Sequence, residues 1–241
     1  MKINKYKHDL DYSYTLGTTL TYELLKNKPY LIKRVYISPK INKTDSVNEI
    51  LFDFEKNNIP VEENLKAFNI LSPKGNCFMI AEFKKEENEL EDKPHIVLVN
   101  PSDAGNLGTI FRTAAGFGIE NIAIITPSVD YYDPKVIRSS MGAFFHLNVK
   151  YFDSIEDYIK CFPQHKLYSF MLKASKPINK IEKSKENYSL IFGNEATGLP
   201  DEYLNFSNSI IIPHSKNIDS LNLPIAVSIG LYEFTKNIWQ E

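Results

Sequence analysis

Several features that would mark particular classes of protein are missing from this sequence of 241 residues. Its two cysteines, Cys77 and Cys161, lie far apart, so neither a disulfide framework nor paired metal ligands are expected. The five histidines are scattered and show no ligand-like spacing to either cysteine. No apolar run approaches the roughly 18 residues that a membrane span requires, and residues 1–14 hold no stretch typical of a secretory signal. The sequence therefore predicts a cytoplasmic protein with no metal and no membrane segment.

A surplus of basic residues is also missing, because 28 Lys and Arg stand against 30 Asp and Glu. Proteins that bind nucleic acids usually carry such a surplus, since lysine and arginine make the phosphate contacts. The average conceals an asymmetry: residues 1–43 hold nine basic residues and three acidic ones. This segment is either an ordinary solvated face or a basic patch that meets an RNA backbone.

One boundary divides the chain. The charged stretch at 84–93 lacks apolar periodicity and ends at Pro94, as expected of an exposed linker. We therefore assign residues 1–86 to a first domain, 87–93 to the linker and 94–241 to a second domain. For the first domain the patterns predict an α/β unit, with helices at 14–26 and 47–57 and strands at 35–38, 59–63 and 78–83.

The second domain alternates strand and helix patterns with short connections. Unbroken apolar runs at 96–99 and 122–125 are typical of strands buried on both faces of a parallel sheet. Between them, apolar residues recur at helical spacing. Three further strands, at 167–171, 189–192 and 210–212, and a last helix at 224–239 are predicted. The second domain is therefore expected to be α/β, with a mostly parallel sheet covered by helices.

Ligands in such sheets bind beyond the carboxyl ends of the strands, and three loops occupy that position. The first is NPSDAGNLGTIFR, at 100–112. Gly105 and Gly108 permit close backbone approach, and a helix that begins near Asn106 directs free N–H groups at its ligand. With a rotation of about 100° per residue, Arg112 points about 160° away from the apolar stripe and is therefore exposed. Taken alone, Arg112 is a solvated surface arginine and Asn106 is a helix cap.

The second loop is LIFGNEATGLP, at 190–200. It places the carboxylate of Glu195 between Gly193 and Gly198, which suits a loop wrapped closely around a ligand. A plain turn explains the two glycines equally well, but not their recurrence at the same end of another strand.

The third loop lies within IIIPHSKNIDSLNLPIA, at 210–226. Ser220 and Asn222 precede the last helix, and Pro224 falls in its first turn, where proline is tolerated. Either Ser220 or Asn222 then serves as a simple N-cap, with or without a role in a site.

Together, in this order and spacing, the loops resemble the motifs of a known family. The set G-N-x-G-x-x-x-R, then G-x-E-x-x-G-L, then I-P…S-L-N is similar to the three motifs of the SpoU (TrmH-like) RNA 2′-O-ribose methyltransferases of the SPOUT class. The segment RSSMGAFFHL at 138–147 resembles the one that this family places between its first two motifs. The resemblance covers roughly residues 94–238.

The resemblance implies a fold, a cofactor and partners. The family has a parallel sheet whose C-terminal segment forms a trefoil knot, and its members are homodimers. S-adenosylmethionine is held largely by backbone, which maps here to Gly193, Ile212 and Leu221. Ile212 and Leu221 can be buried core residues at the same time. The first domain is similar to a small α/β RNA-binding module shared with ribosomal proteins, most of all around Gly17 and Glu23.

The implied reaction is methyl transfer from the sulfonium of S-adenosylmethionine to a ribose 2′-hydroxyl of structured RNA, either rRNA or tRNA, without a metal. In the family, the arginine that corresponds to Arg112 acts as a base or holds the developing oxyanion. The second role is easier for Arg112, because its guanidinium can stay charged. The resemblance also implies that Asn106 and Glu195 orient Arg112 and the ribose, while Ser220 and Asn222 complete the pocket. These five residues are the predicted catalytic set.

Two departures from the family pattern stand out. The first motif usually reads D-P-G-N, whereas here residues 102–104 separate Asn100-Pro101 from Gly105-Asn106, which predicts a longer loop over the site and an altered choice of substrate. The third motif has Leu223-Pro224 where Val-Ser is common. The alternative function is a non-catalytic RNA-binding or ribosome-assembly protein that retains the fold; a base methyltransferase is disfavoured by the motif around Arg112.

Overall fold

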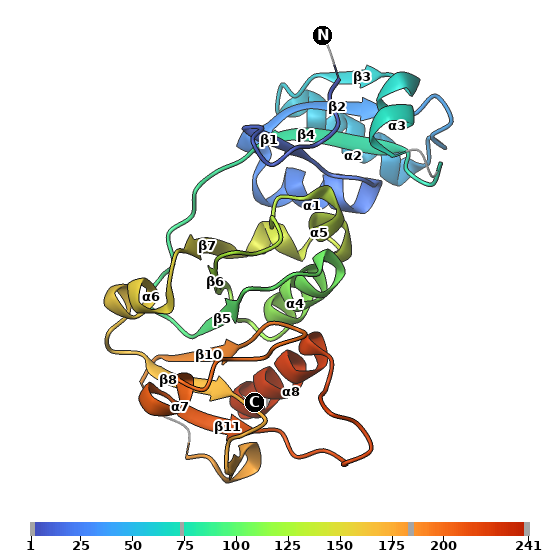
Figure 1. Ribbon diagram of the computed structural model, residues 1–241. Coiled ribbons are helices and arrows are strands. Elements are labelled where there is room, and N and C mark those ends of the chain that lie inside the picture. Colours follow the sequence, from blue (N-terminus) through green and yellow to red (C-terminus); the bar gives the residue numbers. More distant parts are fainter. Residues whose placement is uncertain (1–2, 73–74, 183–185, 239–241) are drawn as a thin grey trace. The chain divides into compact units, whose positions relative to one another are not determined.

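The computed structural model describes residues 3–72, 75–182 and 186–238, which fall into two compact units (Figure 1). The first unit comprises the described residues of Met1–Glu86 together with Asp130–His146. The second comprises those of Glu87–Val129 and Leu147–Glu241.

The first unit is built on a mixed sheet that, within the described residues, has four strands in the order β1-β4-β2-β3. β4 runs antiparallel to β1 and β2, while β3 runs parallel to β2. The elements of this unit are β1 (Tyr12–Tyr14), α1 (Thr18–Asn27), a 3-10 turn η1 (Pro29–Leu31), β2 (Ile32–Ile37), α2 (Asp45–Lys56), β3 (Val61–Glu63), α3 (Leu65–Leu71), β4 (Met79–Lys84), α5 (Pro134–Ser139) and a second 3-10 turn η2 (Ala143–His146).

The predicted elements of the first domain are confirmed in kind, but several of their starts differ. The helix expected from Tyr14 begins at Thr18, because Tyr14 belongs to β1 and pairs with Glu82 of β4. The helix expected at 47–57 begins at Asp45, because the side chain of Thr44 caps it by accepting the N–H of Val47. Neither β1 nor α3 was predicted.

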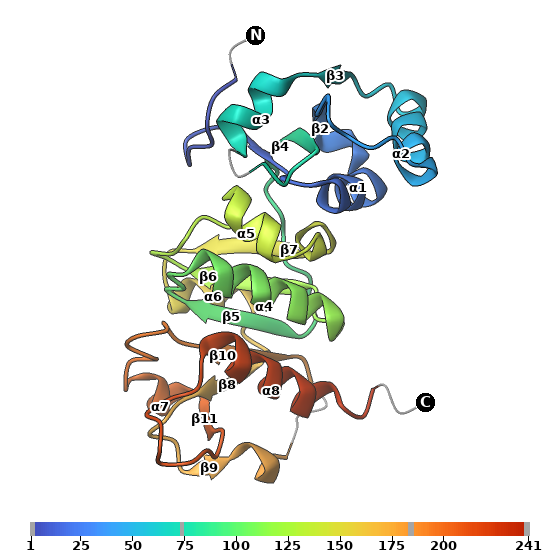
Figure 2. The ribbon, with the colours of Figure 1, turned by 90° about the vertical axis from the view of Figure 1, so that its right-hand side faces the viewer.

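The second unit contains a sheet of seven strands, counted over the described residues, in the order β7-β6-β5-β10-β8-β11-β9. Every pairing in it is parallel. Helices α4 and α8 lie side by side on one face and α6 lies on the other (Figures 1 and 2). The predicted parallel sheet with helical cover is therefore confirmed. Its elements are β5 (His95–Val99), α4 (Ala104–Gly116), β6 (Asn121–Ile125), β7 (Asn148–Phe152), α6 (Ile155–Cys161), β8 (Lys166–Phe170), β9 (Lys176–Pro177), the 3-10 turn η3 (Ile178–Lys180), β10 (Tyr188–Phe192), α7 (Tyr203–Phe206), β11 (Asn208–Ile211) and α8 (Leu223–Thr235).

Two differences from the prediction concern the margins of this unit. Strands β7 and β9 and helices α6 and α7 were not predicted, because they are short and have neither an unbroken apolar run nor a long periodic pattern. The last helix ends at Thr235, four residues before the predicted end at 239, a position that lies outside the described residues.

A buried polar network lies at the amino ends of the central strands of the second unit. His95 Nδ1 is 2.8 Å from the hydroxyl of Tyr158, and that hydroxyl is 2.6 Å from Ser189 Oγ. His165 is 2.9 Å from Ser189 Oγ through Nδ1 and 2.9 Å from Asp92 Oδ1 through Nε2. Burial lowers the pKa of His95 to about 4. The network therefore connects β5, β10 and the residue before β8 to Asp92, which lies in the segment that precedes β5.

Within the described residues no helix is long and apolar enough to span a bilayer. Over the same parts of the chain, no group of three or more His, Cys, Asp or Glu side chains is placed to share a metal ion.

Candidate active site

The first motif loop connects β5 to α4, and Asp103 starts the helix. The carboxylate of Asp103 accepts the N–H of Asn106 at 2.7 Å, and α4 begins with Ala104. The interpretation of Asn106 as the helix cap is therefore wrong, because Asp103 already fills that role. The side chain of Asn106 is left available, and its amide donates to Glu195 Oε1 at 3.2 Å.

Residues 102–104 are not an added loop. Asp103 is the N-cap and Ala104 the first helical position, which is the position that favours proline. Asp103-Ala104-Gly105-Asn106 therefore takes the place of the family's D-P-G-N, with alanine where proline is usual. Two of the three residues expected to lengthen the loop, Asp103 and Ala104, therefore belong to the start of α4.

The carboxylate of Glu195 joins the second motif loop to the first. Its Oε2 accepts the N–H and the hydroxyl of Ser102 at 3.1 and 2.9 Å, and its Oε1 accepts the N–H of Asp103 at 3.3 Å and the amide of Asn106. Burial raises the pKa of Glu195, but the hydrogen bonds from its own backbone, Asn106 and Ser102 lower it by more, so that the pKa lies below its ordinary value. Glu195 is thus an ionised clamp between the two loops.

The second motif loop folds back on itself at its two glycines. A Cβ on Gly193 would lie 2.2 Å from the carbonyl carbon of Gly198 and 2.4 Å from the nitrogen of Leu199. Gly198 has a φ of +67°, a left-handed conformation that favours glycine. Gly193 is therefore required because the backbone of Gly198 and Leu199, in the same loop, packs directly against it.

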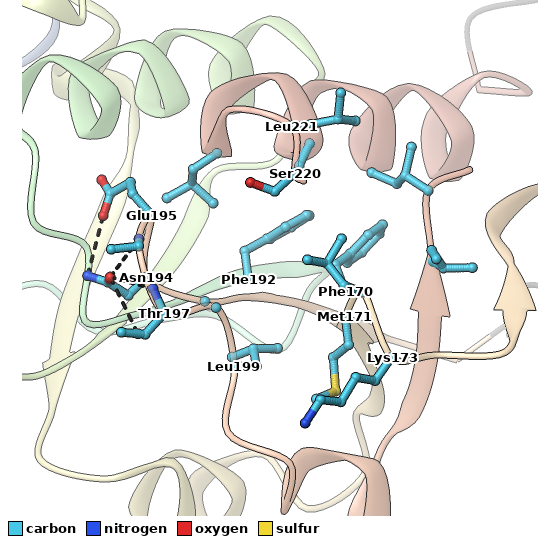
Figure 3. Close-up of a pocket in the computed structure, with 18 of the residues that line it drawn as sticks. Phe170, Met171, Lys173, Phe192, Asn194, Glu195, Thr197, Leu199, Ser220 and Leu221 are labelled. Carbon is cyan, nitrogen blue, oxygen red and sulfur yellow. Dashed lines mark hydrogen bonds between the residues drawn. The ribbon is translucent and has the colours of Figure 1, made fainter. Parts of the chain in front are cut away.

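Asn194 fixes this loop, a role that was not predicted from the sequence. Its Oδ1 accepts the N–H groups of Ala196 and Thr197 at 2.9 and 3.2 Å, and its Nδ2 donates to the carbonyl of Asn100 at 2.8 Å. Figure 3 shows Asn194 beside Glu195 and Thr197. An asparagine directly after a strand and a glycine is the signal that could have identified it.

A cavity of about 300 Å³ opens at the carboxyl ends of β8, β10 and β11. Gly193, Ile212 and Leu221, the predicted cofactor residues, all line it, together with Glu195 and Ser220. In Figure 3, Ser220 and Leu221 lie on one side of the cavity, and Leu199 and Lys173 lie on the other. This is the end of a parallel sheet at which ligands bind.

Two stacked phenylalanines lie between these sides of the cavity. The rings of Phe170 and Phe192 have centroids 4.3 Å apart and planes 15° apart. A Cβ on Gly230 of α8 would lie 2.9 and 3.0 Å from their Cζ atoms. Gly230 therefore lets α8 approach the ring pair, a function signalled only by a glycine inside a helix.

Arg112 and Asn222 do not line this cavity. Arg112 is exposed on α4, and among the described residues it makes no hydrogen bond or ion pair. Asn222 is the N-cap residue of α8 but makes no side-chain cap hydrogen bond, and Pro224 stands in the first turn as predicted. The structure thus brings Asn106 to Glu195 and Ser220 to the cavity, and leaves the guanidinium of Arg112 open to a ligand.

Comparison with known proteins gives consistent results. The model of the SpoU rRNA Methylase family matches residues 93–232, more than half of the chain. A protein of Synechocystis described as an uncharacterized tRNA/rRNA methyltransferase is 34% identical over 147 residues, which are 60% of this chain and 53% of that protein. The 23S rRNA (guanosine(2553)-2′-O)-methyltransferase RlmP of Bacillus subtilis is 30% identical over 150 residues, 61% of this chain and 60% of that protein. The chain therefore spans little more than half the length of these relatives.

A solved structure shows the same fold. The AdoMet-bound rRNA methyltransferase from Sinorhizobium meliloti superposes with a TM-score of 0.81 at 24% identity, over 95% of this chain and 89% of that one. The matched family segment contains β5 to β11 and all three motif loops. The chain belongs to the SpoU rRNA methylase family.

Proposed function

We propose that this protein transfers a methyl group from S-adenosylmethionine to a ribose 2′-hydroxyl of structured RNA, either rRNA or tRNA. The observation that carries the proposal is the meeting of the motif loops at one edge of the sheet, where Glu195 binds the first loop and lines the cavity beside the third. The names of relatives support the reaction, since RlmP is named as a 2′-O-methyltransferase and the Sinorhizobium meliloti enzyme is described as AdoMet-bound.

The cavity fits the cofactor in size and in character. Its volume lies at the lower end of the roughly 300–1,000 Å³ of small-molecule sites, which are mostly apolar with a few placed polar groups. The Phe170–Phe192 pair supplies the apolar part, and the backbone at Gly193, Ile212 and Leu221 would supply hydrogen bonds. When bound, S-adenosylmethionine supplies the methyl group that is transferred.

Arg112 is proposed to hold the negative charge that develops on the attacking oxygen. A ribose hydroxyl is a weak nucleophile and loses its proton as it attacks. An arginine guanidinium stays charged at neutral pH, so it donates hydrogen bonds and does not take that proton. The guanidinium of Arg112 makes no hydrogen bond or ion pair with the described residues, so its donors remain available to the oxyanion or to an RNA phosphate.

Glu195 is proposed to orient Asn106 and, through α4, Arg112. It is poorly suited to accept the proton of the ribose, because both of its oxygens already accept hydrogen bonds and its pKa is lowered. Ser220 and Asn222, on either side of Leu221 at the entrance to α8, are proposed to complete the site on the ribose side.

The finer architecture is proposed from the family. Residues 94–241 would form the knotted methyltransferase domain, which the strand order and the packing of α8 against α4 support. The protein would be a homodimer, and the exposed Ile225 and Tyr232 of α8 support a buried contact there. Light scattering coupled to size-exclusion chromatography tests the dimer: the mass of one chain would contradict it.

Residues 1–86 are proposed to be a ribosomal-protein-like RNA-binding domain, joined by the linker 87–93, in a protein of the cytoplasm. The nine basic residues within 1–43 support this assignment. The salt dependence of RNA affinity tests it. The slope of log affinity against log salt should become shallower when the lysines of 1–43 are replaced by glutamine, and an unchanged slope would contradict the assignment.

Analysis of RNA nucleosides by mass spectrometry, from cells with and without the gene, tests the reaction. Loss of one 2′-O-methyl nucleotide in the deletion strain is expected and would identify the target. An unchanged set of 2′-O-methyl nucleotides would favour the alternative, a non-catalytic RNA-binding protein that retains the fold.

A further inference from the structure

The carboxylate of Glu195 is held mainly from one short segment, residues 102–106. Ser102 contributes two of its hydrogen bonds, from the backbone N–H at 3.1 Å and from the hydroxyl at 2.9 Å, both to Oε2. Asp103 and Asn106 contribute the bonds to Oε1 at 3.3 and 3.2 Å. Asn194 adds a long contact of 3.5 Å to Oε2.

The bond from the hydroxyl of Ser102 to Oε2 is the shortest of these hydrogen bonds. Among the described residues this hydroxyl has no partner other than Glu195. It does not start the helix, because Asp103 caps α4 through its own carboxylate. The side chain of Ser102 is therefore dedicated to one oxygen of Glu195, while the other oxygen serves the Asn106 amide.

A carboxylate that is anchored at one oxygen presents its second oxygen in a defined direction. Without the Ser102 hydroxyl, Oε2 would lose its shortest hydrogen bond. The Ser102 N–H, the long contact from Asn194 and the bond from the backbone of Glu195 itself would remain, and they would hold the carboxylate less firmly against rotation about its last torsion angle. Rotation would move Oε1 away from Asn106, on the helix that carries Arg112. Small displacements of reacting groups lower the rate of a reaction, because the reacting atoms need a defined geometry.

We propose that Ser102 is a positioning residue for methyl transfer. Its hydroxyl fixes the Glu195 carboxylate, and the carboxylate in turn keeps Asn106 and α4 in position beside the cofactor cavity. This inference rests on the proposed function. The proposed role of Ser102 is exerted through Glu195 and not through a contact with the cofactor or the ribose.

The test compares Ser102→Ala, Ser102→Thr and a control, Ser128→Ala. Ser128 follows β6, the strand next to β5, and its hydroxyl donates to the carbonyl of Val129 and not to Glu195. With RNA from the deletion strain, kcat should fall about tenfold in Ser102→Ala, as expected for a lost hydrogen bond to a charged group, with KM for RNA and the melting temperature unchanged. Ser102→Thr should restore kcat, because it keeps the hydroxyl, and Ser128→Ala should match the wild type.

A second readout does not depend on methyl transfer. If the wild type transfers no methyl group, that result overturns the proposed function alone. The carbon-13 NMR signal of the Glu195 carboxyl should titrate at a higher pH in Ser102→Ala than in the wild type or Ser102→Thr, because a bond to the ionised form is lost. An unshifted titration in Ser102→Ala would overturn the inference. The inference would also be overturned if Ser102→Ala kept the full kcat of an active wild type. It would be overturned as well if Ser102→Ala and Ser102→Thr lost kcat to the same extent and melting temperature to the same extent.

Discussion

Lowering the pH should destabilise the second unit through His95. Burial lowers the pKa of this histidine from its ordinary value of 6.5 to about 4 in the folded protein. Between these two values the unfolded chain binds a proton at His95 that the folded chain does not bind, so the free energy of unfolding falls as the pH falls. The contribution of neutral His95 to the free energy of unfolding is therefore fully present above about pH 6.5 and is lost below about pH 4.

The size of this effect follows from the difference between the two pKa values. Each pKa unit corresponds to about 1.4 kcal/mol, so the full contribution of His95 is roughly 3 kcal/mol. That is a large share of the roughly 5–15 kcal/mol that stabilises a typical domain. The cause is structural: burial disfavours the charged imidazole most, and the nearby His165 disfavours it further. The carbonyl of Glu91, 2.7 Å from Nε2, favours the charged form but does not offset the burial.

Urea denaturation of the wild type and His95→Gln, followed by circular dichroism between pH 7.5 and 4, measures this effect. Glutamine can both donate and accept a hydrogen bond but does not titrate, so its curve should lack the contribution of His95. The wild type should lose roughly 3 kcal/mol relative to the variant over this range. Parallel pH dependences of the two proteins, whatever their difference at pH 7.5, would show that His95 does not cause the loss of stability.

Three further substitutions test the local architecture of the site. Gly193→Ala should lower the affinity for S-adenosylmethionine at least about tenfold in calorimetry, because its Cβ meets backbone at 2.2 Å; the control Gly116→Ala meets nothing within 4 Å, and equal affinities would contradict the loop geometry. Gly230→Ala should lower the unfolding free energy by about 1–3 kcal/mol, since its Cβ presses on the phenylalanine pair, and an unchanged unfolding midpoint would contradict this packing. Asp103→Ala should cost about 1 kcal/mol in urea denaturation through loss of the α4 cap, and a cost of zero would assign the cap elsewhere.

The central part of the fold could be predicted from the sequence because its strands are buried on both faces. The runs at 96–99 and 122–125 are continuously apolar, and the structure makes them β5 and β6 of a parallel sheet. The margins could not be predicted, because edge strands bury little. β7 is only partly buried, and β1 spans three residues whose pairing with β4 depends on distant chain.

The hydrogen bonds that join the motif loops could not be predicted from the sequence. Motif spacing selected Glu195 and Asn106, yet the bond between them depends on the approach of two loops that are 89 residues apart in sequence. Asn194 was missed because its side chain acts on backbone groups, which leave no pattern in the sequence. The start of α4 was misplaced because Asp103, Asn106 and Asn100 are all residue types that cap helices.

The proposed function is tested most directly by measuring the transfer of labelled methyl from S-adenosylmethionine to RNA from the deletion strain, with the wild type and with Arg112→Ala. Arg112 is exposed and makes no hydrogen bond or ion pair with the described residues, so its removal should leave the melting temperature and cofactor affinity unchanged. If Arg112 has its proposed role, the wild type methylates a ribose 2′-hydroxyl and the variant loses at least about a hundredfold in kcat. Turnover in Arg112→Ala close to that of the wild type would contradict that role.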